Sequence, residues 1–433
     1  MREIKQGYKL TDIGVIPEDW EVKQVGDIYD LICGFAFSGN DISNSGTHRL
    51  LRGINITEGE IRHNDDIDRF FNNDVSSLNK YFLEIGDLVI GMDGSKVGKN
   101  SALITQNDKG ALLVQRVARL KSIGNKVSTS YLYLFINSLF FTKYVDGLKT
   151  NSAIPHISAK DIKSFLIPIP LTYAEQIVIA TVLSDVDALI AALDKKITKK
   201  QQIKQGAMQQ LLTGKKRLPG FRGENKFKQT EIGFIPEDWN MVSVGDITKF
   251  HKQGYYTKEN YKENGEYYLL RGTDMQNPKI DLSSTPKINV SQYDYEAYKV
   301  LNGDFLFVRS GAIGRYGIAD ENTPKSIFGS YLINFRFIED INAKYFGYFY
   351  ESEISICQLY SIIQGGANLN INAENIKALK IPLPPLAEQI GIAQILTDMD
   401  NEISQLEADR NKYEQIKAGM MQQLLTGKIR LIS

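Results

Sequence analysis

The chain has 433 residues, enough for two or three domains that each bury a core of their own. Its 51 basic and 51 acidic side chains give a formal net charge of zero. That balance excludes a global basic field, so any nucleic-acid contact must use local patches or a basic partner. Two cysteines and four histidines argue against a disulfide framework or a zinc site. The first residues lack the apolar core of a signal peptide, and the most apolar run, residues 131–141, is too short to span a bilayer, so we expect a soluble, cytoplasmic protein.

The first half of the chain begins with a segment that ends in Pro-Glu-Asp-Trp at residues 17–20. A mixed body follows, in which Gly-Asp turns precede apolar runs such as residues 86–90, a pattern typical of buried strands. Residues 131–141 are apolar and aromatic and predict a short buried helix. Alternating prolines at residues 167–170 close this body, which we predict to be one domain spanning residues 1–170.

A long helix is predicted over residues 171–214. Thr172 and Glu175 fit a capping box, in which each side chain satisfies a free amide of the first turn. Apolar residues then recur every three or four positions, and Gly214 stands where a left-handed residue often ends a helix. At 1.5 Å per residue such a helix is about 60 Å long, and its narrow apolar stripe is typical of pairing with another long helix. A basic linker that contains Gly and Pro is predicted at residues 215–228.

The second half of the chain repeats the first. Four motifs occur once in each half: Pro-Glu-Asp-Trp at residues 17–20 and 236–239, Leu-Arg-Gly at 51–53 and 270–272, Ala-Glu-Gln at 174–176 and 387–389, and Met-Gln-Gln-Leu-Leu-Thr-Gly-Lys at 208–215 and 421–428. An identical octapeptide late in both halves is far beyond chance, so the chain contains an internal duplication. We therefore predict a second domain over residues 229–384 and a second long helix over residues 385–433.

The second domain shows the same element types as the first. Residues 303–308 repeat the pattern of a Gly-Asp turn before a buried strand. Apolar and polar side chains alternate over residues 331–337, which predicts a half-buried strand. Residues 345–350 predict a short buried helix. Trp20 and Trp239, which end the opening segment of each half, are expected to anchor the two cores.

These elements predict an α+β fold: two tandem-repeated mixed α/β domains separated by two long antiparallel helices, which form a coiled coil with pseudo-two-fold symmetry. If the helix midpoints near residues 192 and 405 face each other, Lys196 lies near Glu402 and Lys200 lies near Asp398. A contact with phosphate is the alternative role for these lysines. Pairing with the opposite helix or solvation is favoured, because the second copy lacks the lysine run.

Catalytic motifs are poorly represented in the sequence. The segment from Gly94 to Lys99 is one residue short of a phosphate-binding loop, and Asn100 stands where a Mg²⁺-binding hydroxyl is needed. The spacing of Gly311 and Gly314 does not match the dinucleotide-binding fingerprint. The scattered histidines offer no nucleophile–base pair. We therefore expect a chain that is not an enzyme by itself and that carries neither a cofactor nor a metal.

The framework of the two halves repeats, but the inserts between the framework motifs do not. Residues 55–80 share little with residues 274–299, which stand in the equivalent position. Loops carried on a rigid scaffold are common recognition elements. One architecture with two different inserts therefore predicts a binding protein that recognises two different targets.

The order of the motifs resembles that of the specificity subunit of type I restriction-modification enzymes. The resemblance rests on the two Ile-Pro-Glu-Asp-Trp segments, the two Gly-Asp-strand-Gly-x-x-Gly segments, and the two Pro-x-Pro…Ala-Glu-Gln helices that end in Gln-Gln-Leu-Leu-Thr-Gly-Lys, and it covers essentially the whole chain. It implies two target recognition domains, each of which reads one half of a split, asymmetric site in double-stranded DNA. It also implies that the two helices measure the spacer between the half-sites.

The same resemblance implies partners and cofactors. The chain would dock two methylation subunits, which carry S-adenosylmethionine, and join restriction subunits, which hydrolyse ATP with Mg²⁺. No membrane is implied. These chemistries belong to the partner subunits, in agreement with the absence of catalytic motifs from this sequence.

Candidate DNA-binding residues follow from this resemblance and from their positions. Glycine-flanked turns after a strand can approach a DNA backbone closely, and they contain Ser95, Lys96, Lys99, Arg309, Ser310 and Arg315. Tight turns with solvated cations are the alternative. Arg52 and Arg271 occur identically in both halves. Because a residue shared by both copies cannot distinguish two sequences, we favour structural or phosphate-binding roles for these two arginines over base reading.

Three other interpretations stay open at this level. The chain could serve a fused methyltransferase-nuclease of another restriction class, which neighbouring genes would reveal. It could be a coiled-coil scaffold that binds proteins, although divergent inserts at equivalent positions of two bodies would then have no reason. The defective glycine loop alone would support a nucleotide-dependent enzyme.

Overall fold

The computed structural model describes residues 4–124, 127–148, 155–221, 226–257, 261–309, 314–362 and 371–431. The chain divides into two compact units: unit 1 contains residues 1–193 and 409–433, and unit 2 contains residues 194–408. The division passes through both long helices. Each unit therefore holds one mixed α/β domain, the first half of one long helix and the second half of the other, whereas the sequence-based division kept the helices apart from the domains.

Unit 1 begins the chain. Its strands and helices are β1 (Tyr8–Thr11), β2 (Gly14–Pro17), β3 (Glu21–Gln24), α1 (Val25–Ile28), β4 (Tyr29–Cys33), β5 (Ile42–Ser43), β6 (His48–Leu51), β7 (Phe70–Phe71), β8 (Leu88–Gly91), β9 (Ser101–Leu103), β10 (Leu112–Leu113), β11 (Val117–Ser122), α2 (Thr129–Ile136), α3 (Leu139–Leu148), α4 (Ala159–Ser164), β12 (Leu166–Ile169), the first half of α5 (Tyr173–Leu211) and the second half of α10 (Leu386–Leu424).

Unit 2 has a similar but not identical set of elements: among the described residues it adds the helix α6, and residues 244–247, which correspond to α1, form a turn. Besides the remaining halves of α5 and α10, they are β13 (Phe227–Thr230), β14 (Gly233–Pro236), β15 (Asn240–Ser243), β16 (Thr248–Gln253), β17 (Tyr267–Leu270), β18 (Met275–Gln276), β19 (Lys279–Ile280), β20 (Lys287–Ile288), α6 (Gln292–Tyr298), β21 (Phe305–Val308), β22 (Tyr316–Ile318), β23 (Ser326–Phe328), β24 (Leu332–Phe337), α7 (Ala343–Glu351), α8 (Glu353–Ile362), α9 (Ala373–Lys377) and β25 (Lys380–Leu383).

Both units are built on an antiparallel four-stranded sheet, with strand order β4-β11-β8-β9 in unit 1 and β16-β24-β21-β22 in unit 2. A second sheet, of four short strands in unit 1 and three in unit 2, contains one parallel pair, β6 with β10 or β17 with β23. A hairpin (β1–β2 or β13–β14) precedes the tryptophan, and the strand after the tryptophan pairs with the proline-rich strand, β3 with β12 and β15 with β25. This equivalent connectivity confirms the predicted tandem α/β fold.

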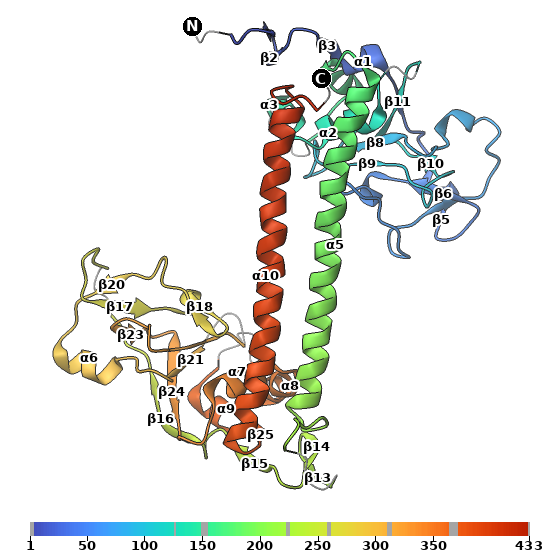
Figure 1. Ribbon diagram of the computed structural model, residues 1–433. Coiled ribbons are helices and arrows are strands. Elements are labelled where there is room, and N and C mark those ends of the chain that lie inside the picture. Colours follow the sequence, from blue (N-terminus) through green and yellow to red (C-terminus); the bar gives the residue numbers. More distant parts are fainter. Residues whose placement is uncertain are drawn as a thin grey trace. The chain divides into compact units, whose positions relative to one another are not determined.

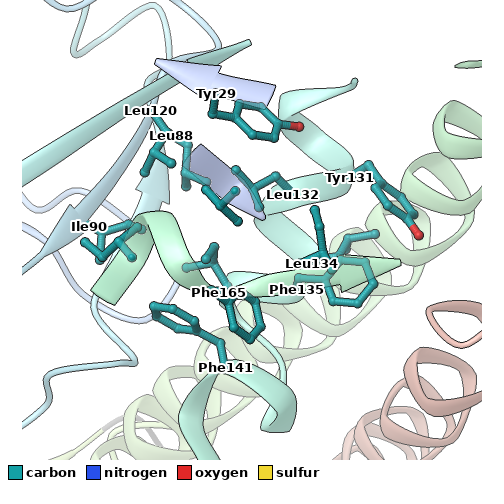
Figure 2. Close-up of a cluster of buried hydrophobic side chains, with 14 of the residues drawn as sticks. Tyr29, Leu88, Ile90, Leu120, Tyr131, Leu132, Leu134, Phe135, Phe141 and Phe165 are labelled. Atoms are coloured by element: carbon teal, nitrogen blue, oxygen red, sulfur yellow. The ribbon is translucent and has the colours of Figure 1, made fainter. Parts of the chain in front are cut away.

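The main core of each unit lies where its four-stranded sheet meets its helices. In unit 1, Leu88 from β8 and Leu120 from β11 gather with Leu132 from α2 in one buried cluster (Figure 2). Trp20 and Trp239 are both fully buried, which confirms them as core anchors. Residues 131–141, predicted as one short helix, form parts of two, because α2 ends at a cap on Asn137 and α3 begins at Leu139.

Strand β24 is buried more completely than its sequence predicts. It lies between β16 and β21, and Leu332, Ile333, Asn334 and Phe335 are all buried. The prediction of a half-buried strand was wrong because a second apolar cluster covers the face opposite the main core. The polar member Asn334 is compensated there by a hydrogen bond of 2.7 Å from its Nδ2 to the buried Asp304 carboxylate.

The two long helices run antiparallel within each unit (Figure 1). In unit 2, Lys204 Nζ lies 2.6 Å from Asp400 Oδ1, and in unit 1 Lys417 Nζ lies 2.5 Å from Asp187 Oδ1. The two ion pairs stand at equivalent positions of the internal repeat. The antiparallel arrangement predicted from the sequence is therefore confirmed in both units.

The predicted interhelix register is displaced by one helical turn. Lys200 pairs with Glu402, at 2.7 Å, and not with Asp398, so the predicted pairs Lys196–Glu402 and Lys200–Asp398 were wrong. The prediction centred the helices on each other. In the structure, the first turns of each helix run past the end of its partner and contact the segment that follows it, through the arginines described below.

Glycine ends both long helices for two separate reasons. Gly214 and Gly427 have φ values of 68° and 67°, the left-handed conformation that was predicted for them. A Cβ atom at either position would also lie 2.4 Å from a proline Cγ, that of Pro236 or Pro17. Conformation and space both require glycine at these two positions.

By length and composition, α5 is apolar enough to cross a membrane. In the structure the first half of α5 belongs to unit 1, where Ile179 and Leu183 are fully buried in the main core. Ile177 and Leu189 on the same half are exposed. Part of the apolar surface of α5 is therefore buried in the core of unit 1, and part of it is exposed.

Candidate functional site

In unit 1, an arginine after α10 joins the opening segment to the start of α5. Arg430 donates to both carboxylate oxygens of Asp19, at 2.9 and 3.0 Å, and it also donates through two nitrogens to Glu175. Its guanidinium lies 5.7 Å from the centroid of the Trp20 ring. Glu175 is only 2% exposed, so its charge depends on this partner. The hydrogen bonds from Arg430 hold the pKa of Asp19 below its usual range.

Unit 2 contains the same arrangement. Arg217 donates to both oxygens of Asp238, at 2.8 and 2.9 Å, and to both oxygens of Glu388, at 2.7 and 2.8 Å. The Trp239 ring centroid lies 5.4 Å from the guanidinium, and Trp239 Nε1 donates to Glu388. Arg217 comes from the predicted linker at residues 215–228. That part of the segment is therefore fixed to unit 2.

These two arginines were not identified from the sequence, although a signal was present. The repeated octapeptide is followed in each half by one variable residue and then by Arg-Leu, at 217–218 and 430–431. The predicted capping box at the start of α5 is also only half formed. The Glu175 amide donates to Thr172 Oγ1 at 3.2 Å, but the Glu175 carboxylate binds Arg430 instead of the helix start.

The glutamine of each Ala-Glu-Gln motif ties a second helix to the core. Gln176 accepts a hydrogen bond from the amide of Ser128, which caps α2, at 2.9 Å. Gln389 accepts one from the amide of Asn342, which caps α7, at 2.9 Å. Both glutamines are almost fully buried. The glutamine of the motif therefore has a structural role, because it joins the long helix to a second helix of the same unit.

The glycine-flanked turn of unit 1 connects β8 to β9 and is exposed. Ser95, Lys96 and Lys99 are all exposed on it. Lys96 Nζ lies 3.3 Å from Glu58, a residue of the insert, but the lysine side chain is still 63% exposed. The turn packs on the domain through Gly98, whose left-handed backbone faces Val145. The predicted cations therefore point to solvent next to the divergent insert.

The equivalent turn of unit 2 lies between β21 and β22. Arg309 and Arg315 flank it and are half-buried, and Ser310 lies outside the described residues. The Arg309 amide donates to the Tyr331 carbonyl at 2.9 Å, and the Val308 amide donates to the Arg315 carbonyl at 3.0 Å. Both arginines are thus held on the sheet by their backbones.

Arg52 and Arg271 bind the inserts of their own units. Arg52 Nη2 donates to the carbonyl of Ile67, and Arg271 Nη2 donates to the carbonyl of Ser284 at 2.8 Å. Arg271 is also paired with the buried Asp274. In both units the arginine holds the divergent insert against the strand that ends in the repeated Leu-Arg-Gly motif, which is a structural reason for its presence in both copies.

Two further exposed residues stand beside the glycine-flanked turns. Arg116 in unit 1 is a non-glycine residue with φ of 66°, its side chain is 63% exposed, and it pairs with Asp93 at 3.1 Å. Tyr331 in unit 2 occupies the corresponding place before β24 and is 67% exposed. Strained backbone and exposed aromatic rings are frequent at binding sites. The sequence carries no motif at either position that would have singled them out.

The chemistry offered by these surfaces is binding. Among the described residues, no cluster of three or more His, Cys, Asp or Glu side chains could hold a metal ion. What the geometry brings together is a scaffold that holds a divergent insert in each unit, next to an exposed turn in unit 1 and next to the half-buried Arg309 and Arg315 in unit 2. Such an arrangement suits the recognition of an extended ligand.

Comparison with known proteins gives a consistent result. Residues 17–205 and 236–418 match the model of the type I restriction modification DNA specificity domain. The type I restriction enzyme MjaVIII specificity subunit of Methanocaldococcus jannaschii is 27% identical over 438 residues, which cover 96% of this chain and 94% of that protein. The EcoBI specificity subunit of Escherichia coli is 24% identical over 396 residues, which cover 88% and 79%. The solved S subunit of the type I restriction-modification system from M. genitalium has a TM-score of 0.57 at 15% identity, covers 96% of this chain and 97% of its own, and shares the fold.

Proposed function

The chain belongs to the type I restriction modification DNA specificity family, and from that membership we propose that each of its two α/β domains reads one half of a split, asymmetric DNA site. The observation that carries this proposal is the duplicated scaffold with two different inserts. Arg52 and Arg271 hold residues 55–80 and 274–299 in equivalent places of the two units. Equal scaffolds with unequal inserts are what recognition of two different half-sites requires.

We further propose that the DNA contacts come from the two glycine-flanked turns. Ser95, Lys96 and Lys99 would contact the first half-site, and Arg309, Ser310 and Arg315 the second. Lysine and arginine on exposed turns supply phosphate contacts, which position a protein on DNA, while the inserts supply base contacts. Arg116 and Tyr331 extend this candidate set to the residues next to each turn.

The partners and cofactors of the assembly are part of the same proposal. The chain would act without catalytic activity of its own, in the cytoplasm, as the subunit that joins two methylation subunits and the restriction subunits to DNA. S-adenosylmethionine, ATP and Mg²⁺ would be bound by those partners. A formal net charge of zero is consistent with a DNA footprint shared among subunits.

The two long helices would set the length of the spacer. Each has 39 residues, which corresponds to about 58 Å of helix at 1.5 Å per residue. The centres of two half-sites one turn of DNA apart are separated by roughly 34–36 Å. The helices are thus of the right order to hold two recognition domains on one face of the duplex.

A domain exchange tests the assignment of one half-site to each domain. Residues 1–170 are replaced with the same region of a relative whose target differs, and the methylated motif is determined in cells that also express the methylation subunit. We expect the bases of one half-site to change while the other half-site and the spacer stay the same. Exchange of residues 229–384 is the matched control and should alter the other half-site; a change of both half-sites in either chimera would refute the modular assignment.

A further inference from the structure

Unit 2 contains a carboxylate whose burial needs an explanation. Glu351 ends α7, and its side chain is only 22% exposed. Burial raises its pKa above the usual range for a carboxyl. A buried charge is costly unless it is paired and hydrogen-bonded. The contacts of Glu351 therefore indicate the role of this buried carboxylate.

Towards the helices, Glu351 faces a lysine that joins α5 to α10. Lys204 Nζ lies 4.0 Å from Glu351 Oε2 and 2.6 Å from Asp400 on α10. The same ammonium lies 5.2 Å from the centroid of the Tyr348 ring, and the Tyr348 hydroxyl donates to Asp400 at 2.8 Å. On this side, Glu351 is connected to the pair of long helices.

Towards the recognition domain, Glu351 accepts a hydrogen bond of 3.1 Å from the hydroxyl of Tyr316, the first residue of β22. The Tyr316 amide donates to Asn277 Oδ1 at 2.9 Å, and Asn277 Nδ2 donates to the Gly314 carbonyl at 2.8 Å. Gly314 precedes Arg315 on the turn that we assign to DNA contact. The Lys204–Glu351 ion pair, these hydrogen bonds and the covalent frame of Tyr316 thus link the long helices to Gly314.

Unit 1 has the same ion pair between α5 and α10, but it has no carboxylate at the position equivalent to Glu351. Lys417 and Asp187 repeat the pair formed by Lys204 and Asp400. At the positions equivalent to Tyr316 and Glu351 stand Ser101 and Asn137, joined by one neutral hydrogen bond of 2.8 Å. Packing of the shared scaffold therefore does not require a carboxylate at this point. The charge of Glu351 is a feature of the second recognition domain alone.

We propose that Glu351 is a positioning residue for the second half-site: through Tyr316 and Lys204 it fixes Gly314 and Arg315 relative to α5 and α10. This inference rests on the proposed function. Held in this way, Arg315 contacts the DNA in one place, and an Arg315 released from the network accepts altered bases at the second half-site. The first domain, which lacks the carboxylate, is unaffected.

The charge of Glu351 also makes this positioning sensitive to pH. The titratable groups that face it are Lys204 on α5, Asp400 on α10, Tyr316 on β22 and Tyr348 on α7. Burial raises the pKa of both tyrosines, so they stay neutral as the pH is lowered from neutrality. Glu351 lines a cavity of about 1130 Å³ next to α8, through which it can exchange protons with solvent. Protonation then removes its attraction for Lys204, as Glu351→Gln would.

The test compares three variants in the full complex with the methylation subunit: Glu351→Gln, Tyr316→Phe and the control Glu353→Gln. Glu353 is exposed at the start of α8 and contacts Gln209, but it has no link to Tyr316. Binding is measured to duplexes with single-base changes in either half-site. Loss of a hydrogen bond to a charged group changes an equilibrium about tenfold, so we expect roughly tenfold lower discrimination at the second half-site for the first two variants.

Three further readouts decide between outcomes. Discrimination at the first half-site and the melting temperature should match those of Glu353→Gln. As the pH falls, the wild type and Glu353→Gln should both lose discrimination at the second half-site, whereas Glu351→Gln, which has no carboxyl group to protonate there, should show no further loss. Unchanged discrimination in Glu351→Gln would overturn the proposal, and so would an equal loss at both half-sites with a lowered melting temperature. Failure of the proposed function itself would look different, because the wild-type complex would then recognise no split site.

Discussion

Seven residues added to both α5 and α10 are expected to lengthen the spacer of the recognised site by about three base pairs, because seven helical residues add about 10 Å and one base pair adds about 3.4 Å. The insertions belong near the equivalent positions Lys195 and Ala408, where the two units meet along the chain. Both helices must be lengthened, since the antiparallel pairs Lys204–Asp400 and Lys417–Asp187 fix their register. Seven residues make nearly two full turns, so the helix faces keep their orientation.

The same seven residues inserted between Gly220 and Phe221 serve as the control, because that insertion lies outside both helices. It should leave the spacer unchanged. The motif is determined in each case from the adenines that the assembled complex methylates. Both half-sites should stay the same in all variants. A spacer that ignores the helix insertions, in a complex that still methylates DNA, would show that the helices do not measure it.

Substitution of Arg430 by Ala should destabilise unit 1 by about 2 to 4 kcal/mol. Breaking a fully buried ion pair costs about 3–5 kcal/mol, and the partial exposure of Arg430 reduces that figure. The cause is Glu175, which would stay buried without a partner. For a unit of this size the loss corresponds to a fall in melting temperature of roughly 5–10 °C. Differential scanning calorimetry measures it directly.

Arg217→Ala is the matched control, because Arg217 makes the same contacts in unit 2. Its partner Asp238 is 21 residues away along the chain, whereas Arg430 and Asp19 are separated by 411 residues. Both arginines also bond a distant glutamate, Glu388 at 171 positions from Arg217 and Glu175 at 255 from Arg430. Only in unit 1 are both carboxylate partners remote in sequence, so the loss of Arg430 frees more of the chain. We expect the larger fall in melting temperature for Arg430→Ala. Equal melting temperatures for wild type and Arg430→Ala would contradict this account.

The pH dependence of that difference has a defined sign. Arg430 holds the pKa of Asp19 below its ordinary value, so the folded unit binds the Asp19 proton more weakly than the unfolded chain does. The Arg430–Asp19 pair contributes its full share to the free energy of unfolding above the ordinary aspartate pKa of about 3.9. That share is lost as the pH falls towards the lowered pKa of Asp19 in the folded unit. The difference in melting temperature between the wild type and Arg430→Ala should therefore become smaller below about pH 4.

The features that the sequence predicted correctly depend on local or repeated patterns. The duplication, the long helices and their glycine ends could be read directly, because apolar periodicity and left-handed caps are local in sequence. The full burial of β24 could not be predicted from the sequence, because it depends on a sheet neighbour and on a second apolar cluster, both from distant segments. The prediction of the interhelix register was wrong for a related reason, because the register is set by how far each helix extends past the end of its partner.

The candidate site shows the same division. The segments that contain Lys96 and Arg315 could be found from their flanking glycines. The arginines that assemble each unit were missed, since Arg217 and Arg430 contact residues up to 411 positions away. Glu351 was missed because its role exists only where α5, α7, α10 and β22 meet. Its counterpart Asn137 gives no hint of a charge at that position.

The most direct test of the central claim is a map of methylated adenines across a genome in cells that express this chain together with its neighbouring methyltransferase gene. The account predicts one motif made of two different half-sites, separated by a gap of fixed length and free sequence. A continuous motif, or a soluble complex that produces no common motif, would contradict it.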